Sequence, residues 1–469
     1  MNELPDGWER MPLGDIIQVR NGYAFKSADF TSAGVPLIRQ SNLTGQNVDL
    51  TKCVYVPKHI ADANSAFSVR KGDILIGMSG SIGEPSVYQG DTPALQNQRT
   101  GLIIFRANKT AHRDFIRYFL IFSEREFAQK GKGIGVQNVS ASDIESIPAP
   151  LPSLPEQRRI VAKLDNLFRR SNNAREELVR IPRLIERYRQ GVLEFAFSGM
   201  LTAKWRKRSP DCHTGGNLLK EIRATRMARA TTTKDRAQIE RAFENGNMFP
   251  REDELGAGID LPDSWTSCRI GAIGTVCNGS TPSRGHAKYW AGSIPWVSSG
   301  EVRNNVIAET REAITRAGYE NSSVKLLPKG TVLLAMIGEG KTRGQSAILG
   351  IEATINQNIA AIVIDHGLVI PEFLWRWFQL QYEQTRRRGA GNGPKALNCQ
   401  AVRDLPFVLP PVEEQREIVS TLNASFSIIE TSEAEANRAV LLLDRLDQAT
   451  LAKAFRGDLV SSESRRHNE

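Results

Sequence analysis

Cysteine is scarce in this chain, and long apolar runs are absent. Only 5 of the 469 residues are cysteine, and they form no close pairs of metal-binding spacing: Cys53, Cys212, Cys268, Cys277 and Cys399. An odd, scattered set favours reduced cysteines over a disulfide framework. No apolar stretch approaches the roughly 18 residues of a membrane-spanning helix, and residues 1–6 lack the character of a secretion signal. We therefore expect a soluble cytoplasmic protein that does not contact a membrane.

Groupings of catalytic residues are also missing. The 6 histidines are isolated from one another and from plausible metal partners. Residues 335–342 end in Gly340-Lys341-Thr342, as a phosphate-binding loop does, but Ala335 stands where that loop needs a glycine to wrap the phosphates. We expect no catalytic residue, no metal and no cofactor in this chain. A nucleotide hydrolase that uses Gly340-Lys341-Thr342 is kept as an alternative from a different class.

The charge balance permits a polyanionic partner. Lysine and arginine number 61 against 52 acidic residues, which gives a formal net charge of +9. That excess is compatible with nucleic acid but does not by itself identify it. A chain of 469 residues also exceeds what one hydrophobic core usually holds, so two or more domains are expected.

The sequence is duplicated with an offset of 258 residues. Leu151-Pro152-Ser153-Leu154-Pro155-Glu156-Gln157 recurs as Leu409-Pro410-Pro411-Val412-Glu413-Glu414-Gln415, and residues 190–199 recur at 448–457. A repeat this long is a duplicated half-protein and not a solenoid unit. Two similar halves suggest two similar tasks done at two places.

Each half combines short strands with one interrupting helix, an α+β pattern. Apolar runs at 74–76, 101–105, 332–336 and 359–364 predict strands, and residues 115–129 and 373–388 predict the helices. We expect six segments: domain 1 at 1–152, a long helix at 153–200, a polar and basic linker at 201–256, domain 2 at 257–410, a second long helix at 411–460 and a disordered tail at 461–469.

The segments that follow each signature predict long helices that pack along a partner helix. Apolar residues recur at a 4-3-4-3 spacing from Ile160 to Val192, and the same phase, weaker in the middle, runs from Ile418 to Thr450. The residues expected at this interface are Ile160, Leu164, Leu167, Leu178, Ile185, Ile418, Leu422, Ile429, Leu443 and Leu446. Tyr188 falls in the same spacing. Pro182 should kink the first helix, or end it and begin another.

The linker between the halves is basic and poor in apolar residues. A short helix is expected over 217–230, whereas the tract beyond it has too little apolar content to fold alone. A solvated linker accounts for the charge, and an arm that touches phosphates is the alternative.

Two globular domains, each followed by a Pro-Leu-Pro…Glu-Gln-x-x-Ile-Val start of a long helix, resemble the specificity subunits of type I restriction–modification enzymes. The resemblance covers nearly the whole chain, although the second copy lacks the Thr202…Trp205-Arg206 extension of the first. It implies a non-catalytic subunit whose two target recognition domains each read half of a split sequence in double-stranded DNA. It also implies docking of two methyltransferase subunits, with restriction motor subunits joining them. S-adenosylmethionine, ATP and Mg would belong to those partners.

If a pseudo-twofold axis relates the halves, the two long helices must run antiparallel and separate two pseudo-symmetric domains. One short segment of each domain, which we call the slot, carries different polar residues at aligned positions. The slot of domain 1 has Arg39, Gln40 and Asn42, and the slot of domain 2 has Ser298, Ser299 and Glu301. Domains that recognise two different half-sites require such a difference. An ordinary polar turn would look the same. Residues expected on phosphates are Lys130, Lys132, Arg386, Arg387, Arg388 and Lys395, and a solvated charge run is the alternative for each.

Two other functions stay open at this point. The chain could serve a related system in which methyltransferase and nuclease are fused in one partner. It could also be an assembly scaffold, which would show no sequence preference on DNA.

Overall fold

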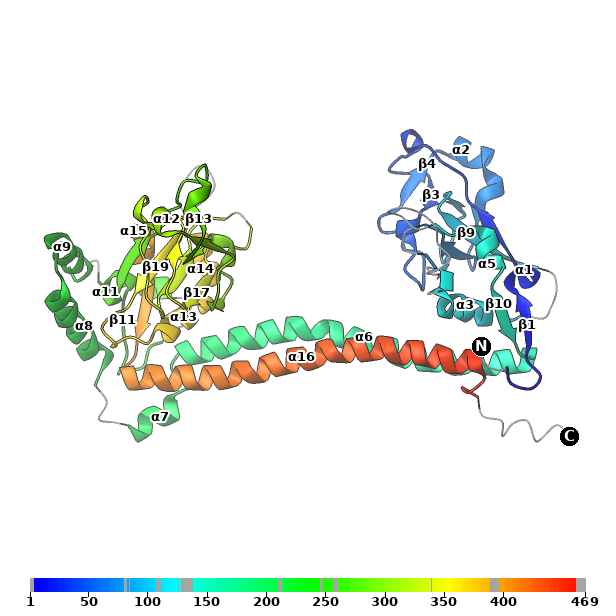
Figure 1. The fold of residues 1–469 in the computed structure, drawn as a ribbon. Coiled ribbons are helices and arrows are strands. Elements are labelled where there is room, and N and C mark those ends of the chain that lie inside the picture. Colours follow the sequence, from blue (N-terminus) through cyan, green and yellow to red (C-terminus); the bar gives the residue numbers. More distant parts are fainter. Residues whose placement is uncertain are drawn as a thin grey trace. The chain divides into compact units, whose positions relative to one another are not determined.

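The computed structural model describes residues 4–79, 82–83, 85–106, 111–124, 126–127, 138–209, 213–244, 248–255, 260–338, 340–388 and 396–460. The chain divides into two compact units, residues 1–180 with 435–469 (unit 1) and residues 181–434 (unit 2). These limits differ from the expected segments because each long helix contributes to both units. Figure 1 shows the elements along the chain.

Unit 1 contains three small sheets. Its strands are β1 (Glu9–Pro12), β2 (Ile17–Asn21), β3 (Val35–Ile38), β4 (Val54–Val56), β5 (Ser68–Val69), β6 (Ile74–Gly77), β7 (Ser86–Val87), β8 (Ala94–Gln96), β9 (Thr100–Phe105) and β10 (Pro148–Leu151). They form sheets in the orders β2-β9-β6-β7, β4-β3-β8-β5 and β1-β10. Its short helices are α1 (Leu13–Ile16), η1 (Ser27–Asp29), η2 (Gln40–Asn42), α2 (Lys58–Ala63), η3 (Ser65–Phe67), α3 (Arg113–Phe122) and α5 (Ala141–Glu145).

Unit 2 repeats this topology. Its strands are β11 (Thr266–Arg269), β12 (Thr275–Asn278), β13 (Trp290–Val297), β14 (Asn305–Ile307), β15 (Glu312–Ile314), β16 (Val332–Ala335), β17 (Ser346–Leu349), β18 (Thr354–Ile355), β19 (Ile359–Val363) and β20 (Pro406–Leu409). The sheet orders are β12-β19-β16-β17-β14, β15-β13-β18 and β11-β20. Each order corresponds to one in unit 1 with two differences: β14 is an added edge strand, and β5 has no counterpart among the strands described in unit 2. The duplicated sequence thus produces a duplicated fold.

The short helices described in unit 2 outnumber those described in unit 1. They are α7 (Ala203–Arg208), α8 (Gly215–Arg229), α9 (Thr233–Ala242), α10 (Glu252–Leu255), α11 (Ile270–Ile273), η4 (Ala287–Tyr289), η5 (Ser299–Glu301), α12 (Arg316–Glu320), α13 (Pro371–Leu380), α14 (Tyr382–Arg387) and α15 (Cys399–Arg403). The helices expected at 115–129 and 373–388 are therefore α3 and the pair α13–α14. The strands expected in both halves are β6, β9, β16 and β19.

The two long helices are α6 (Leu154–Phe197) and α16 (Val412–Arg456). Helix α6 is continuous through Pro182, so the expectation that this proline could end one helix and begin another is wrong. Residues near the start of α6, such as Leu164, lie in the core of unit 1, and residues near its end, such as Phe197, lie in the core of unit 2. Such tertiary packing offsets the main-chain hydrogen bond that the proline removes.

Within each unit, the α6 and α16 segments run antiparallel. In unit 1, Arg175 pairs with Asp444 at 2.8 Å and with Asp447 at 2.7 Å, while Leu164 shares a core with Leu451. In unit 2, the Arg189 guanidinium lies 5.5 Å from the Phe426 ring, and nearer its end α6 shares a core with the start of α16. Early residues of α6 thus meet late residues of α16 in unit 1, and the reverse holds in unit 2.

The duplication leads to reciprocal packing of aromatic residues. In unit 1, Phe455 from the end of α16 lies 5.3 Å from Phe115 and 5.2 Å from Phe119 of α3. In unit 2, Phe197 from the end of α6 lies 5.0 Å from Phe373 and 5.2 Å from Trp377 of α13. The offset of 258 residues relates every member of one cluster to a member of the other. Each domain is therefore completed by the helix end that belongs to the opposite half of the sequence.

The segment between the halves is more ordered than its composition predicts. The short helix expected over 217–230 is α8, and a second helix, α9, follows it; both lie against α11 (Figure 1). Leu218, Leu219 and Ile222 of α8 are buried in the core of unit 2, together with Ile239 of α9. A few well-spaced apolar residues suffice here because the rest of unit 2 supplies the other side of the core.

Candidate nucleic-acid interface

Three turns meet at one edge of each unit, and we call this arrangement the three-turn edge: residues 22–25, 39–42 and 97–100 in unit 1, and 279–282, 298–301 and 356–359 in unit 2. Main-chain hydrogen bonds join the turns, from Asn97 N–H to the Ile38 oxygen (2.9 Å) and from Asn356 N–H to the Val297 oxygen (3.0 Å). The frame is thus the same in both units, while the side chains on it differ.

Gly22 and Gly279 allow the first turn to approach the third. A Cβ atom added to Gly22 would lie 2.2 Å from the Asn97 main-chain oxygen, and one added to Gly279 would lie 1.8 Å from the Ile355 oxygen. No side chain fits at such distances, so glycine is required at both positions.

The slot residues of unit 1 surround the 3-10 turn η2. The Asn42 side chain is buried; its oxygen accepts from Arg39 N–H at 2.9 Å, and its amide donates to the Asp49 main-chain oxygen at 2.9 Å. Asn42 therefore holds the turn with both ends of its side chain. Arg39 and Gln40 are half-buried, with the Arg39 guanidinium 6.0 Å from the Phe30 ring. Base contacts by these three residues stay a prediction.

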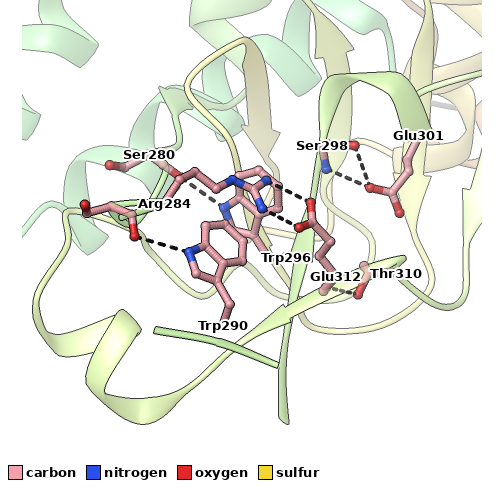
Figure 2. Close-up of polar contacts among 9 residues, drawn as sticks. Ser280, Arg284, Trp290, Trp296, Ser298, Glu301, Thr310 and Glu312 are labelled. Atoms are coloured by element: carbon pink, nitrogen blue, oxygen red, sulfur yellow. Dashed lines mark hydrogen bonds and ion pairs between the residues drawn. The ribbon is translucent and has the colours of Figure 1, made fainter. Parts of the chain in front are cut away.

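In unit 2, Glu301 holds the corresponding turn with both of its carboxylate oxygens. One oxygen accepts from the N–H and the hydroxyl of Ser298, both at 2.8 Å (Figure 2), and the other accepts from Arg311 N–H at 2.9 Å. Ser299 is half-buried on the same turn. Since both carboxylate oxygens are engaged within the chain, Glu301 shapes the slot in this structure. Reading by Ser298, Ser299 and Glu301 also stays a prediction.

The residues expected on phosphates are only partly described. Lys130, Lys132 and Lys395 lie outside the described residues. On and beside α14, Arg388 donates to the Glu254 main-chain oxygen at 3.2 Å, and Arg386 donates to the Tyr382 hydroxyl at 2.9 Å. Arg387 is exposed. Phosphate contacts by these residues remain a prediction, for which Arg387 is the most accessible described candidate.

The residues expected along the long helices fall into three groups. Those that are buried are Ile160, Leu164, Ile418, Leu422 and Ile429. Those that are half-buried are Leu167, Leu178, Ile185 and Leu443. Leu446 is 57% exposed and Tyr188 is 59% exposed, so neither packs in the helix interface as the spacing predicted. A 3.6-residue helix drifts from a seven-residue repeat, and the two positions, related by the offset of 258, leave the interface together.

Unit 2 also contains a cluster of arginine and aromatic side chains that no sequence motif indicates. The Arg284 guanidinium lies 3.7 Å from the Trp290 ring centroid and 5.1 Å from that of Trp296, and two of its nitrogens pair with the two oxygens of Glu312 (Figure 2). The hydrogen bond from Arg284 lowers the pKa of Glu312, and the same bond raises the pKa of Arg284. The pair spans 28 residues and follows no local spacing, so no sequence pattern could have indicated it.

The linker is fixed to unit 2 by a buried carboxylate. Glu414 is fully buried and accepts from the Thr202 hydroxyl (2.6 Å), the Trp265 indole (2.9 Å) and Arg206 (2.5 Å). Glu156, its counterpart in the first half, is only half-buried. The Thr202…Arg206 extension thus has a defined contact in one half of the molecule.

Among the residues that the structure describes, no three His, Cys, Asp or Glu side chains are placed to share a metal ion. Within the same residues, no helix has the length and apolar character needed to cross a bilayer. At the glycine-rich loop, the Lys341 main-chain oxygen accepts from the Tyr382 hydroxyl at 2.7 Å.

The sequence profile described as "Type I restriction modification DNA specificity domain" matches residues 5–181 and again residues 262–439. The chain belongs to this family of type I restriction–modification specificity proteins. The two matches confirm the resemblance and the tandem α+β domains, and membership in this family confirms a non-catalytic recognition protein.

Several relatives of the family align with nearly the whole chain. The EcoBI specificity subunit of Escherichia coli is 26% identical over 98% of this chain and 87% of its own length, and the EcoKI specificity subunit of Escherichia coli strain K12 is 24% identical over 98% and 90%.

Two solved structures share the fold. One is from work on complex assembly and conformational transition of the type I R-M system, with a TM-score of 0.66, 19% identity and coverage of 98% of this chain and 100% of that one. The other is the HsdS subunit from Thermoanaerobacter tengcongensis, with a TM-score of 0.55, 20% identity and coverage of 98% and 99%.

Proposed function

We propose that this chain is the subunit of a type I restriction–modification complex that reads a bipartite double-stranded DNA target, one half-site for each domain. The observation that carries the proposal is the three-turn edge, which has one backbone frame in both units and different polar side chains on it. A common frame with different donors and acceptors suits two readers of two different short sequences. Because the halves are fused and not identical, the target is expected to be asymmetric.

The chemistry of the complex belongs to other subunits in this proposal. Methyltransferase subunits bind S-adenosylmethionine and methylate the target, and motor-nuclease subunits use ATP and Mg to translocate and cut unmodified DNA. The chain itself contributes recognition, in the cytoplasm where foreign DNA arrives. The net charge of +9 supports contact with a polyanion.

Exposed apolar side chains on the long helices support the docking of two copies of one partner. Leu184 and Tyr188 are 57% and 59% exposed, and their counterparts Leu442 and Leu446 are 50% and 57% exposed. Two identical methyltransferase subunits require the same surface twice, and these two positions are apolar and exposed in both copies. Ile428 is also exposed (68%), but its counterpart in the first half is Arg170, so this apolar position is not repeated.

The decisive experiment is single-molecule methylation mapping of DNA from a host that co-expresses this chain with its methyltransferase subunit. We expect methylation at one two-part motif with an unread gap, and none when the chain is omitted. Methylation without a common motif would contradict the proposal. A partner in which methyltransferase and nuclease are fused would identify the related system instead.

Docking is tested on the purified subunits. Tyr188→Asp combined with Leu446→Asp should reduce the amount of methyltransferase that elutes with the chain, whereas Ile428→Asp should leave it unchanged. Equal loss in both variants would show that the repeated positions have no special role.

A further inference from the structure

Arg284 is held in one orientation although it lies on the surface. Its side chain is 54% exposed, yet the guanidinium lies over the Trp290 ring, 3.7 Å from the ring centroid, and pairs with Glu312 through two nitrogens (Figure 2). A long arginine side chain loses rotamer freedom when it is ordered, and an exposed ion pair offsets little of that loss. The arrangement therefore pre-organises the guanidinium.

The platform beneath Arg284 is itself fixed. Trp290 donates from its indole nitrogen to the Ser283 main-chain oxygen at 3.3 Å, and Trp296 donates to the Ser280 oxygen at 3.1 Å. The two indole rings meet edge to face, with centroids 5.0 Å apart. The faces of these rings attract the guanidinium, which favours its position above them.

Three of the five N–H donors of Arg284 remain available in that orientation. Glu312 occupies the two terminal nitrogens, and within the described part of the chain Arg284 makes no other hydrogen bond. Among the available donors, the Nε–H and the adjacent terminal N–H are parallel and lie in the plane of the guanidinium. Two parallel donors fit the two acceptors O6 and N7 of guanine, which lie side by side in the major groove.

The cluster also adjoins the turns already described. Ser280, which receives the Trp296 hydrogen bond, belongs to the three-turn edge, and Trp296 precedes the slot at Ser298 by two residues. Glu312 follows Arg311, whose N–H donates to Glu301 in that slot. Arg284 therefore stands beside the turns that the proposed function assigns to reading.

We propose that Arg284 reads a guanine in the half-site of domain 2, with Glu312 and Trp290 as the residues that position it. This inference rests on the proposed function. A phosphate group offers two acceptors as well, so the experiment must separate a base contact from a backbone contact.

The test uses the full chain in complex with its methyltransferase subunit and maps methylation on a library with randomised half-sites. Arg284→Ala should lower the preference for guanine at one position of one half-site by roughly 5- to 150-fold, the range expected for a bidentate base contact. The other half-site should be unchanged. Arg284→Lys should restore the preference only in part, because an ammonium group lacks the planar pair of donors that the stacked guanidinium holds in place.

Arg316 provides the matched control. It pairs with Glu320 at 2.6 Å in the same unit and is also exposed, but its guanidinium lies 5.9 Å from the Tyr319 ring and has no stacked platform. Arg316→Ala should leave every base preference intact. Glu312→Gln should weaken the guanine preference less than Arg284→Ala, because the stacked arginine stays but is held less firmly.

Two results would overturn the inference. Uniform loss of methylation at all sites in Arg284→Ala, restored by Arg284→Lys, would show a phosphate contact. An unchanged motif in Arg284→Ala would show that the cluster only stabilises the surface. A wild-type complex that methylates without any motif would instead refute the proposed function, so the two failures are distinguishable.

Discussion

A buried glutamine near the start of each long helix forms hydrogen bonds with two loops. The Gln415 side-chain oxygen accepts from Ile370 N–H at 2.8 Å, and its amide donates to the Pro410 oxygen at 3.0 Å. Gln157 makes the same two bonds, with His112 at 2.7 Å and Pro152 at 2.8 Å. The signature residue is thus structural, since it satisfies main-chain groups that would otherwise be buried without partners.

Gln415→Ala should destabilise unit 2 by about 2 kcal/mol, because it leaves a buried N–H and a buried carbonyl unpaired. Tryptophan fluorescence during urea unfolding measures this unit, since Trp8 is the only tryptophan of unit 1. The exposed neighbour Arg416, changed to alanine, is the control. A loss below 0.5 kcal/mol, on the order of a surface substitution, would contradict the structural role.

His366 makes unit 2 sensitive to acid. Burial lowers the pKa of this histidine, whose Nδ1 accepts from Leu368 N–H at 3.1 Å while Nε2 lies 2.8 Å from the Ile273 oxygen. Both contacts are satisfied by the neutral ring. Because the folded pKa lies below the unfolded value near 6.5, stability is complete above that pH and falls as the pH drops through the folded pKa.

The free energy of unfolding of unit 2 should therefore decline more steeply below about pH 6.5 in the wild type than in His366→Gln, by at most about 1.4 kcal/mol per pH unit. Urea unfolding at pH 7.5 and at pH 5.5 measures the difference. His286→Gln, at an exposed position, should follow the wild type. Parallel curves for wild type and His366→Gln would show that protonation of this ring has no part in acid sensitivity.

At the scale of elements, the helix interface separates buried from exposed leucines. Leu422 of α16 is fully buried in the core of unit 2, whereas Leu184 of α6 is 57% exposed in the same unit. Leu422→Ala should cost about 2–5 kcal/mol of unfolding free energy, and Leu184→Ala less than about 0.5 kcal/mol. Urea unfolding followed by tryptophan fluorescence compares them. Similar losses would mean that Leu184 is buried in solution.

The linker helices show where composition misleads. The tract after residue 230 is too polar to fold alone, yet it forms α9, which packs beside the expected helix α8 in the core of unit 2. Arg226 of α8 is buried and donates to the main-chain oxygens of Gly271 (2.7 Å), Ala272 (2.7 Å) and Gly274 (3.0 Å) at the end of α11. Nothing in the local sequence signals that an arginine will bond to carbonyl groups some 45 residues away.

For the whole molecule, the duplication was the most predictive feature of the sequence. It indicated two α+β domains, two long helices and the aligned turns, because an offset that persists over hundreds of residues reports a repeated fold. It could not show that Phe197 and Phe455 each pack in the opposite half, nor that Asn42 and Glu301 are engaged by their own turns. Those contacts depend on distances in space that a one-dimensional spacing does not carry.

The reciprocal packing bears on how one half-site could be exchanged. Replacing residues 1–152 with the equivalent domain of a relative should change one half-site of the methylated motif and leave the other intact, as methylation mapping would show. The donor must keep aromatic residues where Phe115 and Phe119 contact Phe455, because α16 belongs to the recipient. A donor without them should lose stability in unit 1, since truncating a buried phenylalanine cluster costs about 3–5 kcal/mol. A change in both half-sites from a stable exchange protein would show that the two domains do not read DNA independently.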